Sequence, residues 1–167
     1  MAKKLLKGEN LDIFTNKTMS IKEIKDLKYS QEMATVVGVQ LMCFRKDQEF
    51  DLVYDTCSIV PSHGKLIAKA DQLFCKTCVK IVSGQKMVQL KAEVKDDSEK
   101  CMWVSIFNQC SKVILEGQYA TFIKCSHFER VQILKNIEED ESLNYVFEVN
   151  VKKGKFTNVI AKSITKM

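Results

Sequence analysis

Four potential metal ligands, spaced C-x5-H-x11-C-x2-C, constrain the fold of this chain more than any other feature of its sequence. They are Cys57, His63, Cys75 and Cys78. The two residues between the last two cysteines allow one tight turn to direct both sulfur atoms at a single ion, as in zinc ribbons. Four protein ligands leave no coordination position for a substrate or a water molecule. The pattern therefore predicts a Zn²⁺ ion with a structural role, held in a ribbon at about residues 54–82.

Three other interpretations of these residues stay open. Cys75 and Cys78 could form a redox pair, although such pairs usually open a helix and a strand-like run follows here. A disulfide framework is typical of small secreted chains, whereas this sequence has seven cysteines, an odd number, and no signal-peptide pattern. His63 could be an incidental loop histidine. The other cysteines fall in apolar runs and are interpreted as small core residues: Cys43, Cys101, Cys110 and Cys125.

Composition and charge are those of one globular domain. Of the 167 residues, 46% are hydrophobic and 28% are charged, and no apolar run is long enough for a transmembrane helix, so we expect no membrane partner. The 26 lysines and arginines exceed the 21 aspartates and glutamates, which gives a net charge of +5. This excess permits a polyanionic partner without requiring one. We interpret residues 1–19 as a basic N-terminal arm and residues 20–167 as the domain.

Alternation of apolar and polar residues predicts most of the strands. Residues 87–95 and 101–108 alternate residue by residue, as half-buried strands do. Ser20 with Glu23 and Ser126 with Glu129 are capping boxes that open helices. The second of these helices carries an apolar stripe of Phe128, Val131, Leu134 and Ile137. Further strands are predicted at residues 34–44, 50–54, 119–125, 145–152 and 156–165, and short helices at residues 20–28 and 111–115.

This order of elements predicts an all-β fold with added helices. Five or six core strands, with helices late in the chain, are typical of a small closed Greek-key barrel, the oligonucleotide/oligosaccharide-binding (OB) fold. The zinc ribbon would then be inserted between the first two strands of a five-stranded OB barrel.

The strand at residues 101–108 indicates where a nucleic acid would bind. If Val104 and Ile106 face the core, Trp103 and Phe107 share the opposite face, beside Lys91 of the neighbouring strand. Exposed aromatic rings next to a cation are what single-strand binding proteins use to stack bases and hold phosphates. Alternatively, a loop or the ribbon covers Trp103. Further candidate contacts are Phe156, Lys153 and Lys155 at the final hairpin, and Lys124.

The order and spacing of four segments resemble a known family. The segments are residues 34–37 (ATVV), the ribbon at residues 54–78, residues 102–107 (MWVSIF) with the helix after them, and residues 147–151 (FEVNV). From about residue 20 to residue 164 the sequence resembles the zinc-containing C-terminal OB domain of the large subunit of replication protein A. The resemblance implies partners of three kinds: single-stranded DNA, neighbouring OB domains of a parent chain, and protein subunits of a replication protein A-like or telomerase complex. It also implies a nuclear location.

The sequence departs from this family in three places. The family's ribbon usually has four cysteines with C-x4-C in its first half, whereas His63 here follows Cys57 after five residues. The loop of the final hairpin is shorter. The family's C-terminal helix, which builds the three-subunit complex, would follow Met167, the last residue of the sequence. Such divergence resembles a specialised paralogue, and the family includes large-subunit-like proteins of telomerase holoenzymes that hold telomeric DNA.

We therefore predict a single-stranded DNA-binding domain that serves telomeric DNA and telomerase, or DNA replication and repair. The alternative is a protein assembly module of the same complex with little DNA affinity of its own. An enzyme is not expected, because His63 and His127 are the only histidines and no serine or cysteine has a recognisable base beside it. A Gly-rich phosphate-binding loop is also missing from the sequence.

Overall fold

Five long strands of the computed structural model, which describes residues 16–60 and 63–167, close into a barrel. They follow one another around it in the order β2-β9-β10-β8-β7, and β7 pairs again with β2. This closed five-stranded barrel with helices confirms the predicted fold class. The strands are β2 (Gln31–Phe44), β7 (Gly84–Lys95), β8 (Cys101–Phe107), β9 (Tyr145–Lys153) and β10 (Thr157–Lys166).

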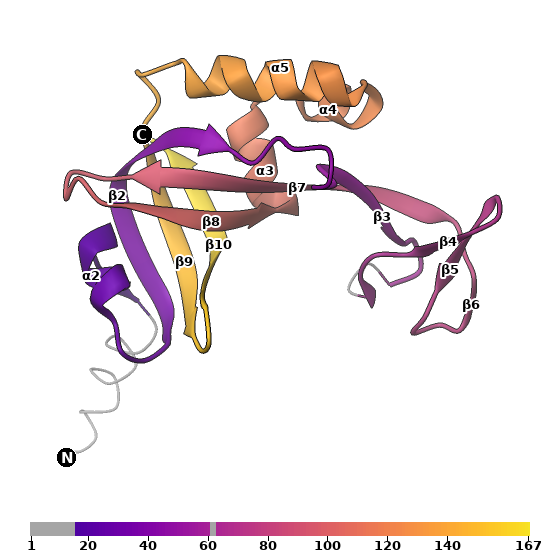
Figure 1. Ribbon diagram of the computed structural model, residues 1–167, viewed down its shortest axis with the longest axis horizontal. Helices are drawn as coiled ribbons and strands as arrows, with labels where there is room; N and C mark the ends of the chain where they lie inside the picture. The colour runs from indigo at the N-terminus through magenta and orange to yellow at the C-terminus, as the bar shows by residue number, and fades with distance from the viewer. Residues whose placement is uncertain (1–15, 61–62) are drawn as a thin grey trace.

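The remaining elements lie around the barrel (Figure 1). Two short strands extend its sheet at the edges, β1 (Lys17–Thr18) beside β2 and β3 (Val53–Cys57) beside β7. Three strands form a separate small sheet: β4 (Ile67–Lys69), β5 (Gln72–Cys75) and β6 (Lys80–Ile81). The helices are α2 (Ile21–Asp26), α3 (Asn108–Leu115), α4 (Tyr119–Lys124) and α5 (His127–Glu138).

One bent strand closes the barrel. The first part of β2 pairs with β9, and its last residues pair with β7. Between Val36 and Val39 the register with β9 shifts, and Gly38 there has a φ of +63°. Glycine adopts this left-handed conformation without the cost that a Cβ imposes. The resulting bulge re-aims β2 from one side of the barrel to the other.

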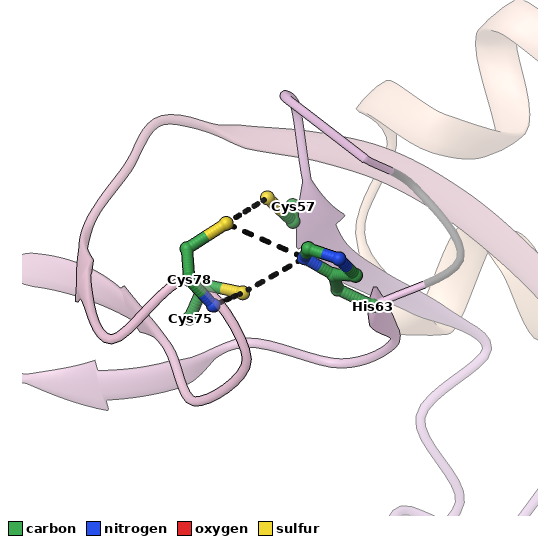
Figure 2. Close-up of side chains that lie close together, drawn as sticks. All are labelled: Cys57, His63, Cys75 and Cys78. Atoms are coloured by element: carbon green, nitrogen blue, oxygen red, sulfur yellow. Dashed lines mark hydrogen bonds between the residues drawn. The ribbon is translucent and has the colours of Figure 1, made fainter.

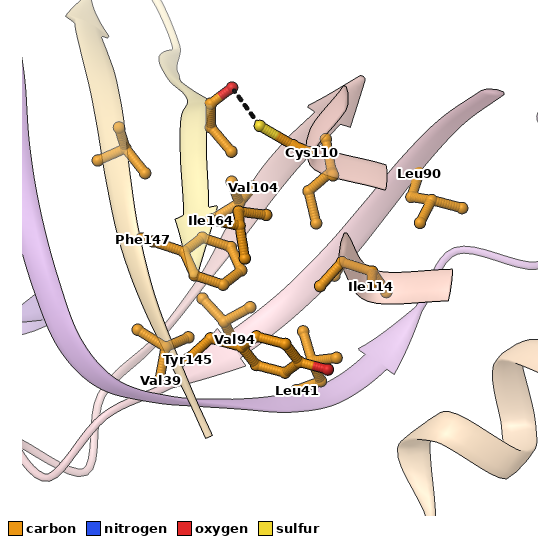
Figure 3. Packing of buried hydrophobic residues seen from close by; sticks show 14 of the residues in the cluster. Val39, Leu41, Leu90, Val94, Val104, Cys110, Ile114, Tyr145, Phe147 and Ile164 are labelled. Carbon is orange, nitrogen blue, oxygen red and sulfur yellow. Dashed lines mark hydrogen bonds between the residues drawn. The ribbon is translucent and has the colours of Figure 1, made fainter. Parts of the chain in front are cut away.

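The barrel interior is filled by the inward-facing residues of the alternating strands. Met102, Val104 and Ile106 of β8 are buried, as predicted from the alternation. Tyr145 and Phe147 of β9 pack edge to face, with ring centroids 6.2 Å apart, and Figure 3 shows them among the aliphatic side chains of this core. Burial raises the pKa of Tyr145 to about 12. The core thus fixes which face of each strand points to solvent.

Both predicted capping boxes are present. The Ser20 side chain accepts a hydrogen bond from the Glu23 N–H, and Ser126 does the same for Glu129. The buried Ile21 at the start of α2 donates its backbone N–H to Asp96 Oδ2 at 2.9 Å, which ties the helix to the turn between β7 and β8. In α5, Leu134 and Ile137 are buried. The two helices therefore begin at the predicted residues.

The prediction of a strand at residues 119–125 is wrong, because these residues form α4. Their aromatic and β-branched side chains favour strands as an intrinsic preference. In the folded chain Phe122 is fully buried, and its N–H donates to Gln118 O at 2.8 Å, a helical bond. α4 packs against α3 and α5. This tertiary packing overrides the local preference.

The apolar stripe predicted for α5 is only partly buried. Phe128 is 79% exposed, whereas Leu134 is fully buried. Each residue turns an α-helix by about 100°, so two steps of three residues place Phe128 about 120° around the axis from Leu134. A stripe with a strict three-residue spacing therefore rotates away from the barrel.

The small sheet β4-β5-β6 is the predicted ribbon, and it extends from the barrel at the far ends of β3 and β7 (Figure 1). At this junction Gly84 pairs with Cys57. A Cβ on Gly84 would lie 2.7 Å from Leu73 Cδ1 and 2.8 Å from Asp55 Oδ1, so the ends of these two side chains would have to move to admit one. The ribbon has a small core separate from that of the barrel: Cys57, Leu66, Cys75 and Val82.

Of the predicted N-terminal arm, residues 1–15 lie outside the described residues. Lys17 and Thr18 at its end form β1, which pairs in parallel with Ala34 and Thr35 of β2. Within the described part of the chain, none of the helices has the length and apolar character needed to span a bilayer.

Candidate metal centre and nucleic-acid interface

The four predicted metal ligands lie together at the base of the ribbon (Figure 2). Cys57 ends β3, Cys75 ends β5, and Cys78 follows in the turn before β6. His63 reaches the same point from the loop between β3 and β4, and the ligand atoms all lie within 4.8 Å of one another. We call these four residues the ligand cluster.

The spacing within the ligand cluster fits one tetrahedral ion. Cys57 Sγ lies 3.7 Å from Cys78 Sγ. His63 Nδ1 lies 3.5 Å from Cys75 Sγ and 3.3 Å from Cys78 Sγ. With metal–sulfur bonds of about 2.3 Å and metal–nitrogen bonds of about 2.0–2.1 Å, tetrahedral geometry separates neighbouring ligands by roughly 3.5–3.8 Å. The cluster can therefore hold a metal ion through four protein atoms, and the His63 ring lies among the three sulfur atoms.

The pKa values of two cysteines in the ligand cluster are shifted in opposite directions. The N–H groups of Val60 and Ile59 donate to the Cys57 sulfur and lower the pKa of that thiol to about 6. Burial acts in the opposite direction on Cys78 and, together with the neighbouring thiols, raises its pKa to about 11. The Cys78 N–H donates to Cys75 Sγ at 3.3 Å. A metal that binds here displaces the remaining thiol protons, because the thiolate is the form that coordinates.

The knuckle that holds Cys75 and Cys78 contains a strained residue. Val79 has a φ of +56°, its N–H donates to Cys75 O at 2.8 Å, and its side chain is 72% exposed. A β-branched residue in the left-handed region is disfavoured by about 1–2 kcal/mol. The turn around the ligand cluster imposes this conformation.

Val79→Gly is therefore expected to stabilise the ribbon. Relief of the strain exceeds the entropic cost of glycine, about 0.5–1 kcal/mol, so the net gain is up to about 1 kcal/mol. The variant should retain its metal at a several-fold higher chelator concentration than the parent. Thr77→Gly in the same turn, where φ is not positive, is the matched control and should lose its metal earlier. A Val79→Gly variant that loses its metal sooner than the parent would contradict this account.

The second candidate site lies on the outer face of β7 and β8. Trp103 is 42% exposed and Phe107 is 38% exposed, whereas Val104 and Ile106 between them are buried. The alternative in which a loop or the ribbon covers Trp103 does not hold. In the register of the two strands, Glu93 pairs with Trp103, Lys91 with Ser105, and Gln89 with Phe107.

Residues directly opposite each other on neighbouring strands share a face. Lys91 therefore lies between the two aromatic positions, two register pairs from each. We call Lys91, Trp103 and Phe107 the binding face. It combines two exposed rings with a cation between them, the arrangement that stacks bases and contacts phosphates.

Cations border Trp103 on two sides. A hollow of about 340 Å³ is lined by Arg45, Lys91 and Trp103. A second hollow of about 330 Å³ is lined by Trp103 together with Lys25 of α2 and Lys153 of β9, among others. Lys153 was among the predicted contacts, whereas Arg45 and Lys25 were missed. They come from segments distant in the sequence, so only the barrel closure brings them to Trp103.

The hairpin between β9 and β10 carries the second predicted ring. Phe156 is 79% exposed, and Lys155 Nζ lies 5.9 Å from its ring centroid. Lys153 Nζ donates to Thr157 Oγ1 at 3.2 Å, which holds it beside the second hollow. Lys124 is exposed at the last residue of α4, and none of the described contacts brings it to the binding face. Its role stays a prediction.

Comparisons with known proteins identify the fold. No protein-family model matches the sequence, and no curated protein matches it significantly. A structure of a replication protein A heterotrimer bound to ssDNA is similar, with a TM-score of 0.71 and 15% identity over 92% of this chain. The chain shares its fold with this structure. It spans 37% of the length of that matched chain.

Two further structures share the fold. Yeast RPA bound to ssDNA has a TM-score of 0.64 at 14% identity, covering 89% of this chain and 85% of the other. Fission yeast Pot1 and Tpz1 have a TM-score of 0.50 at 9% identity, covering 92% and 93%. At these identities the similarity shows the fold and identifies no binding residue.

Proposed function

We propose that this chain is a single-stranded DNA-binding OB domain and that the strand lies across its binding face. The observation that carries the proposal is the pair of exposed rings, Trp103 and Phe107, with Lys91 between them on the outer face of a closed barrel. Two structures with the same fold are described as bound to ssDNA, which supports this choice of ligand.

The binding face suits unpaired bases. Every base has a π-face, and stacking on an aromatic side chain contributes about 1–3 kcal/mol per base whatever the sequence. Lys91, Arg45, Lys25 and Lys153 lie beside Trp103 and offer partners for the phosphates. Duplex DNA should bind more weakly, because its bases are stacked on one another.

We further propose that the ion of the ligand cluster is Zn²⁺ and that its role is structural. Three thiolates and one imidazole are a common ligand set of structural zinc, and four protein ligands fill its coordination shell. The residues present fit the ion in type and spacing. The ion would hold the ribbon together and take no part in a reaction, and we propose that the chain is not an enzyme.

The setting that we propose is a replication protein A large-subunit-like protein in the nucleus. Its task would be binding telomeric DNA for telomerase, or DNA replication and repair, beside neighbouring OB domains and protein subunits. The matched structures of an RPA heterotrimer and of Pot1 with Tpz1 support protein partners in general. The alternative, a protein assembly module, is favoured by Phe128 of α5, an aromatic side chain that is 79% exposed.

The Lys91→Ala variant distinguishes single-stranded DNA binding from the protein assembly module. If phosphates contact the binding face, the variant should bind a fluorescently labelled single strand more weakly than the parent for every sequence. The slope of log affinity against log salt should fall by about 0.7, the value for one phosphate contact on a single strand. The measurement is fluorescence anisotropy over a salt series, with duplex DNA in parallel.

Lys135→Ala on α5 is the matched control, because it removes the same charge from an exposed helix position. Its salt slope should stay that of the parent. Absence of single-strand binding at low salt would replace the proposal with the assembly module, and equal slopes for Lys91→Ala and the parent would move the DNA away from this face.

A further inference from the structure

A carboxylate lies within the proposed DNA site. Glu93 of β7 pairs with Trp103 on one side and with Cys43 of β2 on the other, so all three side chains form one row on the outer face. The Cys43 thiol contacts Glu93 Oε1 at 3.7 Å. Glu93 also lines the hollow of about 330 Å³ that contains Trp103, Lys25 and Lys153.

Glu93 stands out because its surroundings are basic. Among the described residues it forms no ion pair, although Lys25 and Lys153 line the same hollow. A carboxylate repels phosphate, so the presence of Glu93 lowers the affinity of this hollow for a DNA backbone. Its oxygens can only accept hydrogen bonds. The groups of a single strand that can donate to it are those on the base edges.

We propose that Glu93 selects the base that stacks on Trp103 and that it favours guanine. This inference rests on the proposed single-strand binding. A base whose ring covers Trp103 turns its edge along the sheet, toward the residue paired with Trp103, which is Glu93. Phosphates then face the cations, and the base edge faces the carboxylate.

The preference for guanine follows from the donors on each base. The Watson–Crick edge of guanine has two adjacent donors, N1–H and N2–H, which match the two oxygens of one carboxylate. Cytosine and adenine each offer one amino group beside a ring nitrogen that accepts and therefore repels the carboxylate. Thymine offers N3–H between two carbonyl oxygens. The expected order is guanine first, cytosine and adenine next, and thymine last.

The test uses a short dT oligonucleotide in which one dG replaces dT at each position in turn. For the parent chain, dG at one position should raise affinity about tenfold over all-dT, the usual value of a bidentate base contact. Glu93→Gln keeps the shape of the side chain but replaces one acceptor with a donor. Its preference for dG over dT at that position should fall to roughly twofold or less.

Glu139→Gln on the surface at the end of α5 is the matched control, and it should keep the parent's preference. Thermal melting checks that both variants fold. The role of Glu93 would be overturned if the parent chain bound single strands but dG raised the affinity at none of the positions. It would also be overturned if the Glu93→Gln variant kept the preference for dG. Either result would leave the binding face intact. Absence of binding to every oligonucleotide would instead overturn the proposed function itself.

Discussion

Cys75→Ala is expected to release the metal from the chain and unfold residues 57–82 while the barrel stays folded. Cys75 is buried, and its sulfur contacts both His63 and the Cys78 N–H, so its loss opens the coordination shell. Structural zinc sites of this kind contribute on the order of 10 kcal/mol to folding. Metal affinity should therefore fall by several orders of magnitude.

The separate cores explain why only the ribbon should unfold. The ribbon's buried cluster contains four residues, two of which are candidate metal ligands, and it does not merge with the barrel core. Elemental analysis should find almost no zinc, and limited proteolysis should cut within the ribbon alone. Cys125→Ala, which removes a cysteine outside the cluster, is the control and should keep its zinc. Full zinc content in the Cys75→Ala variant would contradict the proposal that Cys75 is a ligand of the ion.

The second large effect is expected when both rings of the binding face are removed. Trp103→Ala combined with Phe107→Ala should weaken single-strand binding by about 2–6 kcal/mol, because each stacked base contributes about 1–3 kcal/mol. Both side chains are on the outer face, so the barrel core is unchanged and the thermal stability should be close to that of the parent. Fluorescence anisotropy with a labelled single strand measures the loss.

Phe128→Ala is the control for the double variant. It removes an exposed aromatic side chain from α5 and should leave the affinity within about twofold of the parent if the bases stack on the binding face. A double variant that binds like the parent would show that the DNA lies elsewhere. A loss caused by Phe128→Ala would point to α5 instead.

The local patterns of the sequence predicted most of this structure. The alternation around Val104 and Ile106 gave the inward face of β8 and with it the exposure of Trp103 and Phe107. Both capping boxes appear at the predicted helix starts. The ligand spacing predicted that Cys57, His63, Cys75 and Cys78 lie together, and they do. Each of these signals is local, because it depends on residues within a few positions of one another.

What the sequence left out depends on contacts between distant segments. Residues 119–125 look like a strand until Phe122 is buried among α3 and α5. Arg45 and Lys25 reach Trp103 only because the barrel closes. The position of Glu93 opposite Trp103 follows from the register of β7 and β8. A hydrophobic pattern does not determine that register to the exact residue when the turn between the strands is irregular. The cations and the carboxylate beside Trp103 therefore could be identified only from the folded chain.

Trp103 is the only tryptophan of the chain, so its fluorescence reports directly on the proposed DNA site. A titration with an unlabelled single strand should change this fluorescence in a saturable way, because a base stacked on the indole alters its surroundings. The midpoint should match that from anisotropy and should move to higher DNA concentration as salt rises. Single-strand binding seen by anisotropy with no change in Trp103 fluorescence would contradict the account.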